Sequence, residues 1–391
     1  RKRKKKEAKE GHAHEYIIFV KITFRSLSNQ STGKKHEVVQ MKINEITKIL
    51  ESWAPLTYAE DFDNVGLLVG DLNSECSKAL VTLDTTEEIV EEAIRVGCEL
   101  IISFHPIIFA GLKKLTGKTY VERAVIKAIK NDIAIYSIHT ALDNHKNGVS
   151  HEMGIQLGLK KQRILIPKNN TLRKLTTYVP SDSVSNVLEV LHTAGAGAMG
   201  NYYGCSFSTK GIGAFTGNDF SNPNTGKTGK PERSEEQQLH LTFDQNKEMD
   251  IIKALKKVHP YEEAAYDICE LSNINQDIGM GSIGELEKSM DEITFFEYVK
   301  KHLNTPHIRH SNYLGQKIKK VALLGGSGSF AVNTAISKGA DVLITADLKY
   351  HNFFEAENKI ILMDIGHYET EQYTKKLIAT YLTKKIPNFA C

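Results

Sequence analysis

The stretch "ELIISFHPIIF" (Glu99–Phe109) decides the fold class, because an apolar run typical of a buried strand ends in a histidine–proline pair. Two further stretches, "IAIYSIHTALD" (Ile133–Asp143) and "IILMDIGHYETE" (Ile360–Glu371), repeat this pattern. Strands that are apolar on both faces are typical of parallel sheets covered by helices. We therefore predict an α/β protein whose strands end on polar groups.

Helical and strand patterns alternate around these runs. "KALVTLD" (Lys78–Asp84) is a predicted strand, and "TTEEIVEEAIRVG" (Thr85–Gly97) is a predicted helix with a threonine cap, early acids and a closing glycine. The same alternation returns after residue 278, with predicted strands in "KIKKVALLGGSG" and "ADVLITADLKYH". This predicts a two-part α/β core, with a largely parallel sheet, from residues 41–168 and 278–391.

Residues 169–277 have a different pattern. They read as strand, helix, strand, strand, helix and strand, an order that predicts a ferredoxin-like α+β domain inserted into the core. The polar stretch "NDFSNPNTGKTGKPERSEEQQ" (Asn218–Gln238) is predicted to be a loop.

The composition is that of an ordinary globular protein, with 391 residues, 41% of them hydrophobic and 25% charged. No run approaches the roughly 18 apolar residues that span a membrane. The five cysteines are scattered without CxxC spacing. Such cysteines fit free thiols in a reducing compartment, so we expect a cytoplasmic protein.

The basic charge is confined to the start of the chain. Residues 1–40 carry a charge of +7, which leaves −4 for residues 41–391 of a chain whose net charge is +3. "RKRKKKEAKE" fits a nucleic-acid arm or a localisation signal, but Met41 opens a clean amphipathic helix. We therefore expect residues 1–40 to be an extension or artefact outside the fold, and the acidic remainder argues against nucleic-acid binding.

Polar groups follow five of the predicted strands. In open parallel sheets, ligand sites lie beyond the carboxyl ends of the strands. One such residue is explained by packing or capping, but five in succession predict a site. The five residues are Asp84, His105, His139, Asp347 and His367.

Two of these histidines are followed four residues later by a carboxylate, Asp143 after His139 and Glu371 after His367. On a helical turn each pair shares one face. Imidazole and carboxylate ligands without thiolate suit Zn, Mn, Fe or Co with positions open to water. The alternative is that each pair only stabilises a helix end.

The motifs that carry these residues resemble those of the NGG-interacting-factor-three-like family, whose members are also called GTP cyclohydrolase 1 type 2 homologues. They are "ISFHPIIFAGLKKLTGK", "YSIHTALDNHKNGVS", "LITADLKYH" and "DIGHYETE", together with "EDFDNVGLLVGD" and "GMGSIGEL". The resemblance covers residues 42–391. The insert, with "GAGAMGNYYGCSFSTKGIGAF" and "HPYEEAAYD", resembles the PII/CutA-like domain of the longer bacterial members.

The resemblance implies a dinuclear metal site in a toroidal homohexamer. His105 and Asp143 would bind one metal ion, His367 would bind the other, and Glu371 would bridge both. Phe104 stands where bacterial members often have a second histidine, so the second position keeps only His367 and the bridge. One or two divalent ions per chain are therefore expected. His139 would orient a ligand or act as the catalytic acid–base group, and Asp347 or Asp364 would hold a metal-bound imidazole.

The resemblance and the predicted ligands lead to one functional expectation and one alternative. The expectation is a metal-dependent, hydrolase-like protein that uses metal-activated water on a small nucleotide-like or anionic substrate, with GTP-cyclohydrolase-type ring opening as one form. The alternative is a ring-shaped metal-binding assembly or regulatory protein without turnover.

Overall fold

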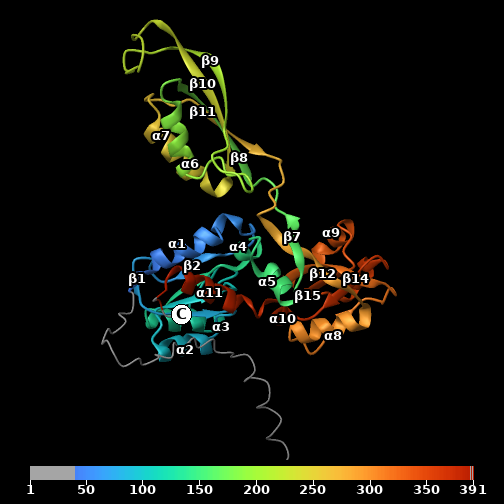
Figure 1. The fold of residues 1–391 in the computed structure, drawn as a ribbon. Helices are drawn as coiled ribbons and strands as arrows, with labels where there is room; N and C mark the ends of the chain where they lie inside the picture. Colours follow the sequence, from blue (N-terminus) through green and yellow to red (C-terminus); the bar gives the residue numbers. More distant parts are fainter. Residues whose placement is uncertain (1–39, 388, 390) are drawn as a thin grey trace, which may run out of the picture. The chain divides into compact units, whose positions relative to one another are not determined.

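The structure, a computed structural model, describes residues 40–387, 389 and 391 (Figure 1). These residues fall into two compact units. Of the described residues, the first unit takes those up to 49, 66–137 and those from 373 onward, and the second takes residues 50–65 and 138–372. The predicted extension at residues 1–40 lies outside the described residues except for Gln40. Among the described helices, none has the length and apolar character that a membrane crossing requires.

The first unit contains a four-stranded sheet of order β2-β6-β5-β4. Strands β4, β5 and β6 are parallel, and β2 joins the edge antiparallel to β6. Every residue of β5 and β6 is buried, as their continuous apolar runs predict. The strands are β1 (Met41–Lys42), which pairs with β3 (Glu75–Cys76), and β2 (Gly66–Val69), β4 (Ala79–Thr82), β5 (Leu100–Ser103) and β6 (Ala134–Ser137).

Helices pack on this sheet through one apolar core. Val90 and Ala93 of one helix and Ala124 and Ala128 of another meet Ile101 of the central strand. The predicted cap of α2 is present, since the Thr86 hydroxyl accepts a hydrogen bond from the Ile89 amide and Gly97 closes the helix at φ 67°. The helices are α1 (Ile43–Trp53), which begins in this unit, α2 (Glu87–Val96), α3 (Tyr120–Lys130) and α11 (Thr374–Lys385).

The second unit contains a six-stranded sheet of order β13-β16-β15-β14-β12-β7. Strands β14, β15 and β16 are parallel, and β12, β7 and β13 are antiparallel to their neighbours. The strands are β7 (Lys160–Pro167), β12 (Gly279–Asp291), β13 (Arg309–His310), β14 (Lys317–Ser327), β15 (Val342–Ala346) and β16 (Ile361–Asp364). The helical segments are α4 (His139–Asp143), α5 (Val149–Gln156), α8 (Glu292–His302), α9 (Val332–Ser337) and α10 (His367–Glu371), with the 3-10 turns η1 (Leu56–Tyr58), η3 (Ser329–Ala331) and η4 (Tyr350–Ala356).

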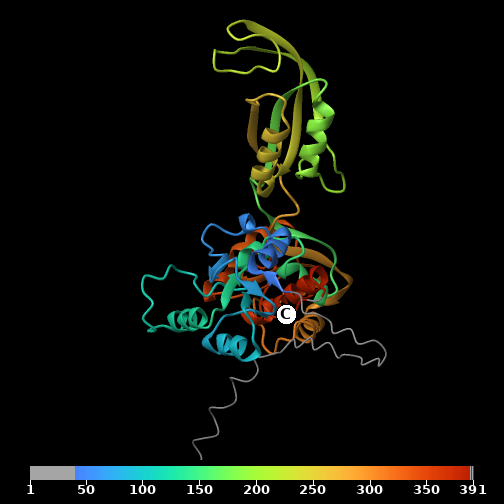
Figure 2. The same cartoon turned by 90° about the vertical axis from the view of Figure 1, so that its left-hand side faces the viewer.

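Residues 172–271 of the second unit form a separate antiparallel sheet of order β11-β8-β10-β9. Helices α6 and α7 cover one face of it, and β9 and β10 form a long hairpin (Figure 2). The elements are β8 (Leu172–Pro180), α6 (Val184–Thr193), β9 (Phe207–Thr216), β10 (Pro231–Asp244), η2 (Gln245–Lys247), α7 (Glu248–Val258) and β11 (Tyr266–Leu271). This is the strand and helix order predicted for residues 169–277, and its ferredoxin-like assignment stays a prediction.

Two expectations need correction. The core has two mixed sheets instead of one largely parallel sheet, because the chain leaves along β7 and returns along the adjacent antiparallel β12. The polar stretch Asn218–Gln238 is a loop only in its first part, since β10 begins at Pro231 and pairs with β9. Pairing across a hairpin overrides the low strand propensity of this polar run.

Candidate functional site

The polar residues predicted to end the strands do follow them closely. In the first unit Asp84 follows β4 and His105 follows β5. In the second unit Asp347 follows β15 directly, and His367 follows β16 as the first residue of α10. His139 begins α4, so both predicted histidine–carboxylate pairs lie on single helical turns that end at Asp143 and Glu371.

In the first unit, His105 is paired with a carboxylate. Its Nδ1 lies 2.9 Å from Oδ1 of Asp84. A carboxylate only accepts hydrogen bonds, so Nδ1 carries the proton and Nε2 is the basic nitrogen of the neutral ring. The Asp84 side chain is 65% exposed, whereas that of His105 is 22% exposed. The preceding residue, Phe104, is fully buried.

In the second unit, His139 is held by a carboxylate that the sequence analysis did not identify. Its Nδ1 donates to Oδ1 of Asp63 over 2.8 Å, and the Asp63 side chain is fully buried. Both the amide and the hydroxyl of Thr140 donate to Oδ2 of Asp63. Burial alone would raise the pKa of Asp63, but the hydrogen bonds from His139 and Thr140 lower it to about 2.

His367, also in the second unit, lies between two carboxylates. Its Nδ1 donates to Oδ2 of Asp347 over 2.6 Å, and its Nε2 lies 3.3 Å from Oε2 of Glu371. The hydrogen bond to Glu371, followed by the charges of Glu371 and Asp347, raises the pKa of His367 to about 9 although burial opposes this. The metal-free imidazole is therefore a cation held by two anions.

Asp347 has an unusual backbone conformation, and its carboxylate accepts a second hydrogen bond besides that from His367. Its φ of 56° lies in the left-handed region, which non-glycine residues seldom adopt. The Ser327 hydroxyl donates to the same oxygen that binds His367. Asp364, the other predicted partner, instead accepts hydrogen bonds from the Leu348 amide and from Arg309. Asp347 is thus the residue that orients His367.

A glycine turn makes room for this group. Gly326 has φ 66°, and a Cβ at this position would lie 2.6 Å from Oε1 of Glu371 and 3.3 Å from Cε1 of His367. Its amide donates to the Thr370 hydroxyl, and the neighbouring amide of Gly325 donates to Ser150. Through these hydrogen bonds the turn is joined to α10 at Thr370 and to α5 at Ser150.

The donor chemistry in the second unit fits a divalent cation. A side chain at Gly326 would crowd Glu371 and His367, and Nε2 of His367 faces Oε2 of Glu371 over 3.3 Å. Metal-bound histidines usually donate the N–H of their other ring nitrogen to a carboxylate, a backbone carbonyl or a water molecule. His139 and His367 meet that condition through Asp63 and Asp347, and His105 of the first unit meets it through Asp84.

Comparison with known proteins assigns the family. The sequence model of the Duf34/NIF3 (NGG1p interacting factor 3) family matches residues 41–391. The chain belongs to this family. A Duf34/NIF3 relative from Halalkalibacterium halodurans, named GTP cyclohydrolase 1 type 2 homolog, is 39% identical over 87% of this chain and 91% of its own. A relative of the same name from Bacillus subtilis is 35% identical over 88% of this chain and 91% of its own.

Solved structures agree with this membership. The crystal structure of a Bacillus cereus protein related to NIF3 matches with a TM-score of 0.77 and 35% sequence identity, covering 90% of this chain and 96% of that one. The mixed α/β architecture is therefore that of its Duf34/NIF3 neighbours, as the resemblance of the motifs predicted.

Proposed function

We propose that this Duf34/NIF3 protein is a metal-dependent, hydrolase-like protein that acts on a small nucleotide-like or anionic substrate. The observation that carries the proposal is the position of His367 between Asp347 and Glu371, which raises its pKa to about 9. A metal ion would replace the extra proton of this imidazole, because the neutral ring and two carboxylates would attract a divalent cation. The relatives named GTP cyclohydrolase 1 type 2 homolog support a nucleotide-like substrate.

The imidazole nitrogens of His105 and His367 and the carboxylate oxygens of Glu371 are atom types that bind divalent transition metals. We propose these three as ligands and Asp143 as a fourth. The set suits Zn, Mn, Fe or Co. When bound, such an ion lowers the pKa of a coordinated water and polarises the bond to be attacked.

The chain's own residues would position ligands and move a proton. Asp84 and Asp347 hold Nδ1 of their histidines, so Nε2 of each ring would be the nitrogen available to a metal ion. Asp63 holds Nδ1 of His139 in the same way, which leaves Nε2 of His139 as the atom that would exchange a proton with substrate or water.

Metal content tests the ligand assignment. Full-length protein purified without chelator or nickel resin should contain one or two metal ions per chain. The variants His367→Ala and Glu371→Ala should each contain much less and remain folded by circular dichroism. His351→Ala changes an exposed histidine of η4 and is the control, with wild-type content expected. Wild-type metal content in both site variants would refute the assignment.

Turnover tests the catalytic part. GTP incubated with the metal-loaded protein should be consumed, as measured by chromatography of the nucleotide. His139→Ala should retain the metal and lose at least about 100-fold in rate, because general acid–base groups contribute roughly 10²–10⁴-fold. Failure to consume GTP and related nucleotides by metal-loaded protein would count against the enzyme.

One observation favours the alternative, a ring-shaped metal-binding assembly or regulatory protein without turnover. Phe104 is fully buried and has no donor atom, so the position beside His105 adds no ligand for a second ion. We propose, from the family resemblance, that the chain forms a homohexamer, which light scattering of the purified protein would test. One metal ion per chain in a stable hexamer without nucleotide turnover would support this alternative.

A further inference from the structure

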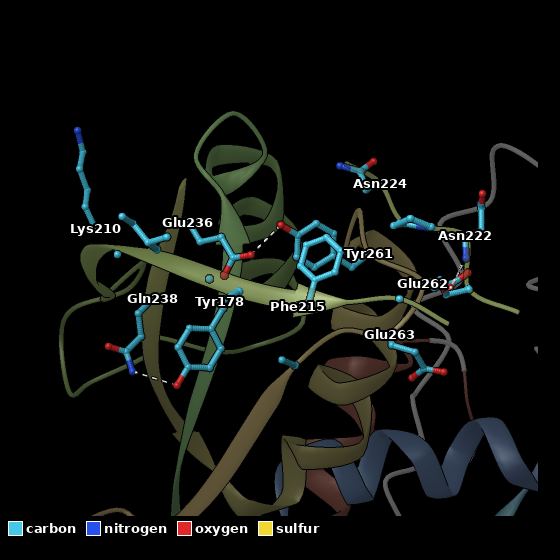
Figure 3. A pocket seen from close by; sticks show the side chains of 18 of the residues that line it. Tyr178, Lys210, Phe215, Asn222, Asn224, Glu236, Gln238, Tyr261, Glu262 and Glu263 are labelled. Atoms are coloured by element: carbon cyan, nitrogen blue, oxygen red, sulfur yellow. Dashed lines mark hydrogen bonds between the residues drawn. The ribbon is translucent and has the colours of Figure 1, made fainter. Parts of the chain in front are cut away.

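A pocket of about 510 Å³ lies in the part of the chain formed by residues 172–271 (Figure 3). It is lined by β8, β9 and β10, by the loop between β9 and β10, and by the segment that follows α7. Its volume is in the range of small-molecule sites. None of the proposed metal ligands lines it.

Three aromatic rings form much of the wall, from Tyr178, Phe215 and Tyr261. The rings of Phe215 and Tyr261 lie 6.5 Å apart at an angle of 52°. Figure 3 shows Tyr261 directed toward Glu236, with Tyr178 below the strand. Aromatic faces of this kind bind apolar groups and also attract cations.

His259 of the "HPYEE" motif positions this wall. Its Nδ1 accepts a hydrogen bond from the Tyr261 amide over 3.1 Å, so the ring proton is on Nε2, which donates to the carbonyl of Tyr178 over 3.0 Å. Burial lowers the pKa of His259. Both ring nitrogens are thus used to fix Tyr261 and Tyr178, and His259 is a positioning residue instead of a metal ligand.

The buried polar group of the pocket is Glu236. It is only 8% exposed, and Oε1 accepts the hydroxyl hydrogen of Tyr261 over 2.8 Å. A Cβ at Gly213 on the paired strand would overlap the Glu236 carboxylate. A glycine at that position therefore lets the carboxylate lie across the strand. Burying a carboxylate beside aromatic rings is costly unless a cation or donor completes its hydrogen bonds.

The charge of the lining indicates the sign of the ligand. Glu236, Glu262 and Glu263 line the pocket, against the single basic side chain of Lys210. Glu262 accepts a hydrogen bond from the Asn222 amide, which ties the loop of residues 217–224 to the pocket rim. A phosphate-bearing ligand would meet net repulsion here, whereas a cation would be attracted.

We propose that this pocket binds an organic cation: a protonated amine that pairs with Glu236 while its apolar body packs against Phe215, Tyr178 and Tyr261. The ammonium would supply the donors that a buried carboxylate requires. The aromatic and apolar lining of the pocket does not suit a bare metal ion, because hard cations prefer several oxygen ligands. This site goes beyond the proposed metal chemistry and does not depend on it.

Three probes of similar size test the proposal on the full-length protein. They are 2-phenylethylamine, which is cationic at pH 7, 2-phenylethanol, which is neutral, and phenylacetate, which is anionic. Binding is followed by ligand-observed NMR titration. The amine should bind with a Kd of about 1 mM or below, which is reasonable for a ligand of its size, and the alcohol and the acid should bind at least about tenfold more weakly.

Paired variants locate the binding. Glu236→Gln keeps the shape and removes the charge, so it should weaken amine binding about tenfold or more. Glu235→Gln alters the exposed neighbour on the same strand and should leave binding unchanged. Tyr261→Phe keeps the ring and should weaken binding less than Glu236→Gln does. Equal binding of amine and acid, equal effects of the two glutamate variants, or no binding of any probe would overturn the proposal.

Discussion

At the scale of single residues, three histidines share one hydrogen-bonding pattern but differ in how firmly it is held. Asp63 is fully buried and accepts hydrogen bonds from His139 and Thr140, whereas Asp84 beside His105 is mostly exposed. The pair of Asp63 and His139 is therefore the more rigid. Rigid support suits a group that must exchange a proton in a fixed position.

This difference predicts an acid-sensitive contribution to stability from Asp63. Its pKa is about 2 in the folded chain and 3.8 for an unperturbed aspartate, so the unfolded chain binds more protons between these values. Stability from this group is full above pH 4 and is lost as the pH falls through 2. Asp63→Asn should lower the free energy of unfolding at pH 7 by about 1–2 kcal/mol and flatten its pH dependence below pH 4.

Urea unfolding of metal-free protein at several pH values measures this effect. Asp61→Asn, at an exposed position two residues earlier, is the control and should behave like the wild type. If the free energy of unfolding of Asp63→Asn depended on pH below 4 as that of the wild type does, Asp63 would not be the group responsible.

Cysteine reactivity is a second prediction at this scale. Burial raises the pKa of Cys76 to about 12 and that of Cys98 to about 11, whereas Cys269 is exposed. The thiolate is the reactive form. Iodoacetamide at pH 8 should therefore label Cys269 of the native protein at least about tenfold faster than Cys76 or Cys98, as measured by peptide mass spectrometry. The difference should vanish in urea.

At the scale of elements, Gly326 of β14 lies against His367 and Glu371, the candidate ligands of α10. Gly326→Ala would combine a left-handed φ of 66° with a Cβ 2.6 Å from Oε1 of Glu371. Gly97→Ala has a similar φ of 67° but no atom within 4 Å of the added Cβ. The two variants therefore share the backbone penalty of about 1–2 kcal/mol and differ in the contact with Glu371.

We expect Gly97→Ala to lower stability by that backbone penalty alone and to leave metal binding unchanged. Gly326→Ala should lose more stability and should bind zinc about tenfold more weakly, since displacing a supporting contact of a ligand has effects of this size. Thermal unfolding and competition with a chromophoric chelator measure both quantities. Equal zinc affinity in the two variants would show that Gly326 does not support the metal ligands.

The elements that could be predicted from sequence are those whose signal is local. The apolar runs of β5 and β6 and the capped helix α2 are present with nearly the predicted bounds. Strands β7 and β12 were not predicted, because β12 contains glycines and its place depends on pairing across the insert. The same limit applies to Asp63, which binds His139 across 76 residues of sequence. The i,i+4 spacing of His367 and Glu371 needed only one helical turn and was predictable.

At the scale of the whole chain, the described residues include three apolar cores that are built from separate sets of residues. One core lies between residues 69 and 135, a second is built from residues 165 and 283–362, and the third lies between residues 175 and 255. The buried residues of the first two cores include none from residues 169–277. The third core thus contributes its hydrophobic stabilisation within the insert.

The insert should therefore be removable. Where the chain enters and leaves it, the Lys168 amide donates to the Ile278 carbonyl over 2.8 Å, and Pro167 pairs with Gly279 in antiparallel register. Replacing residues 169–277 by Asn-Gly would close β7 and β12 with a two-residue hairpin turn.

The shortened protein should unfold in one cooperative transition and retain its metal content, because His105, His367 and Glu371 lie outside the deleted segment. It should lose amine binding, because every residue that lines the pocket is deleted. A shortened protein that is unfolded by circular dichroism would mean instead that the remainder depends on the insert for its stability.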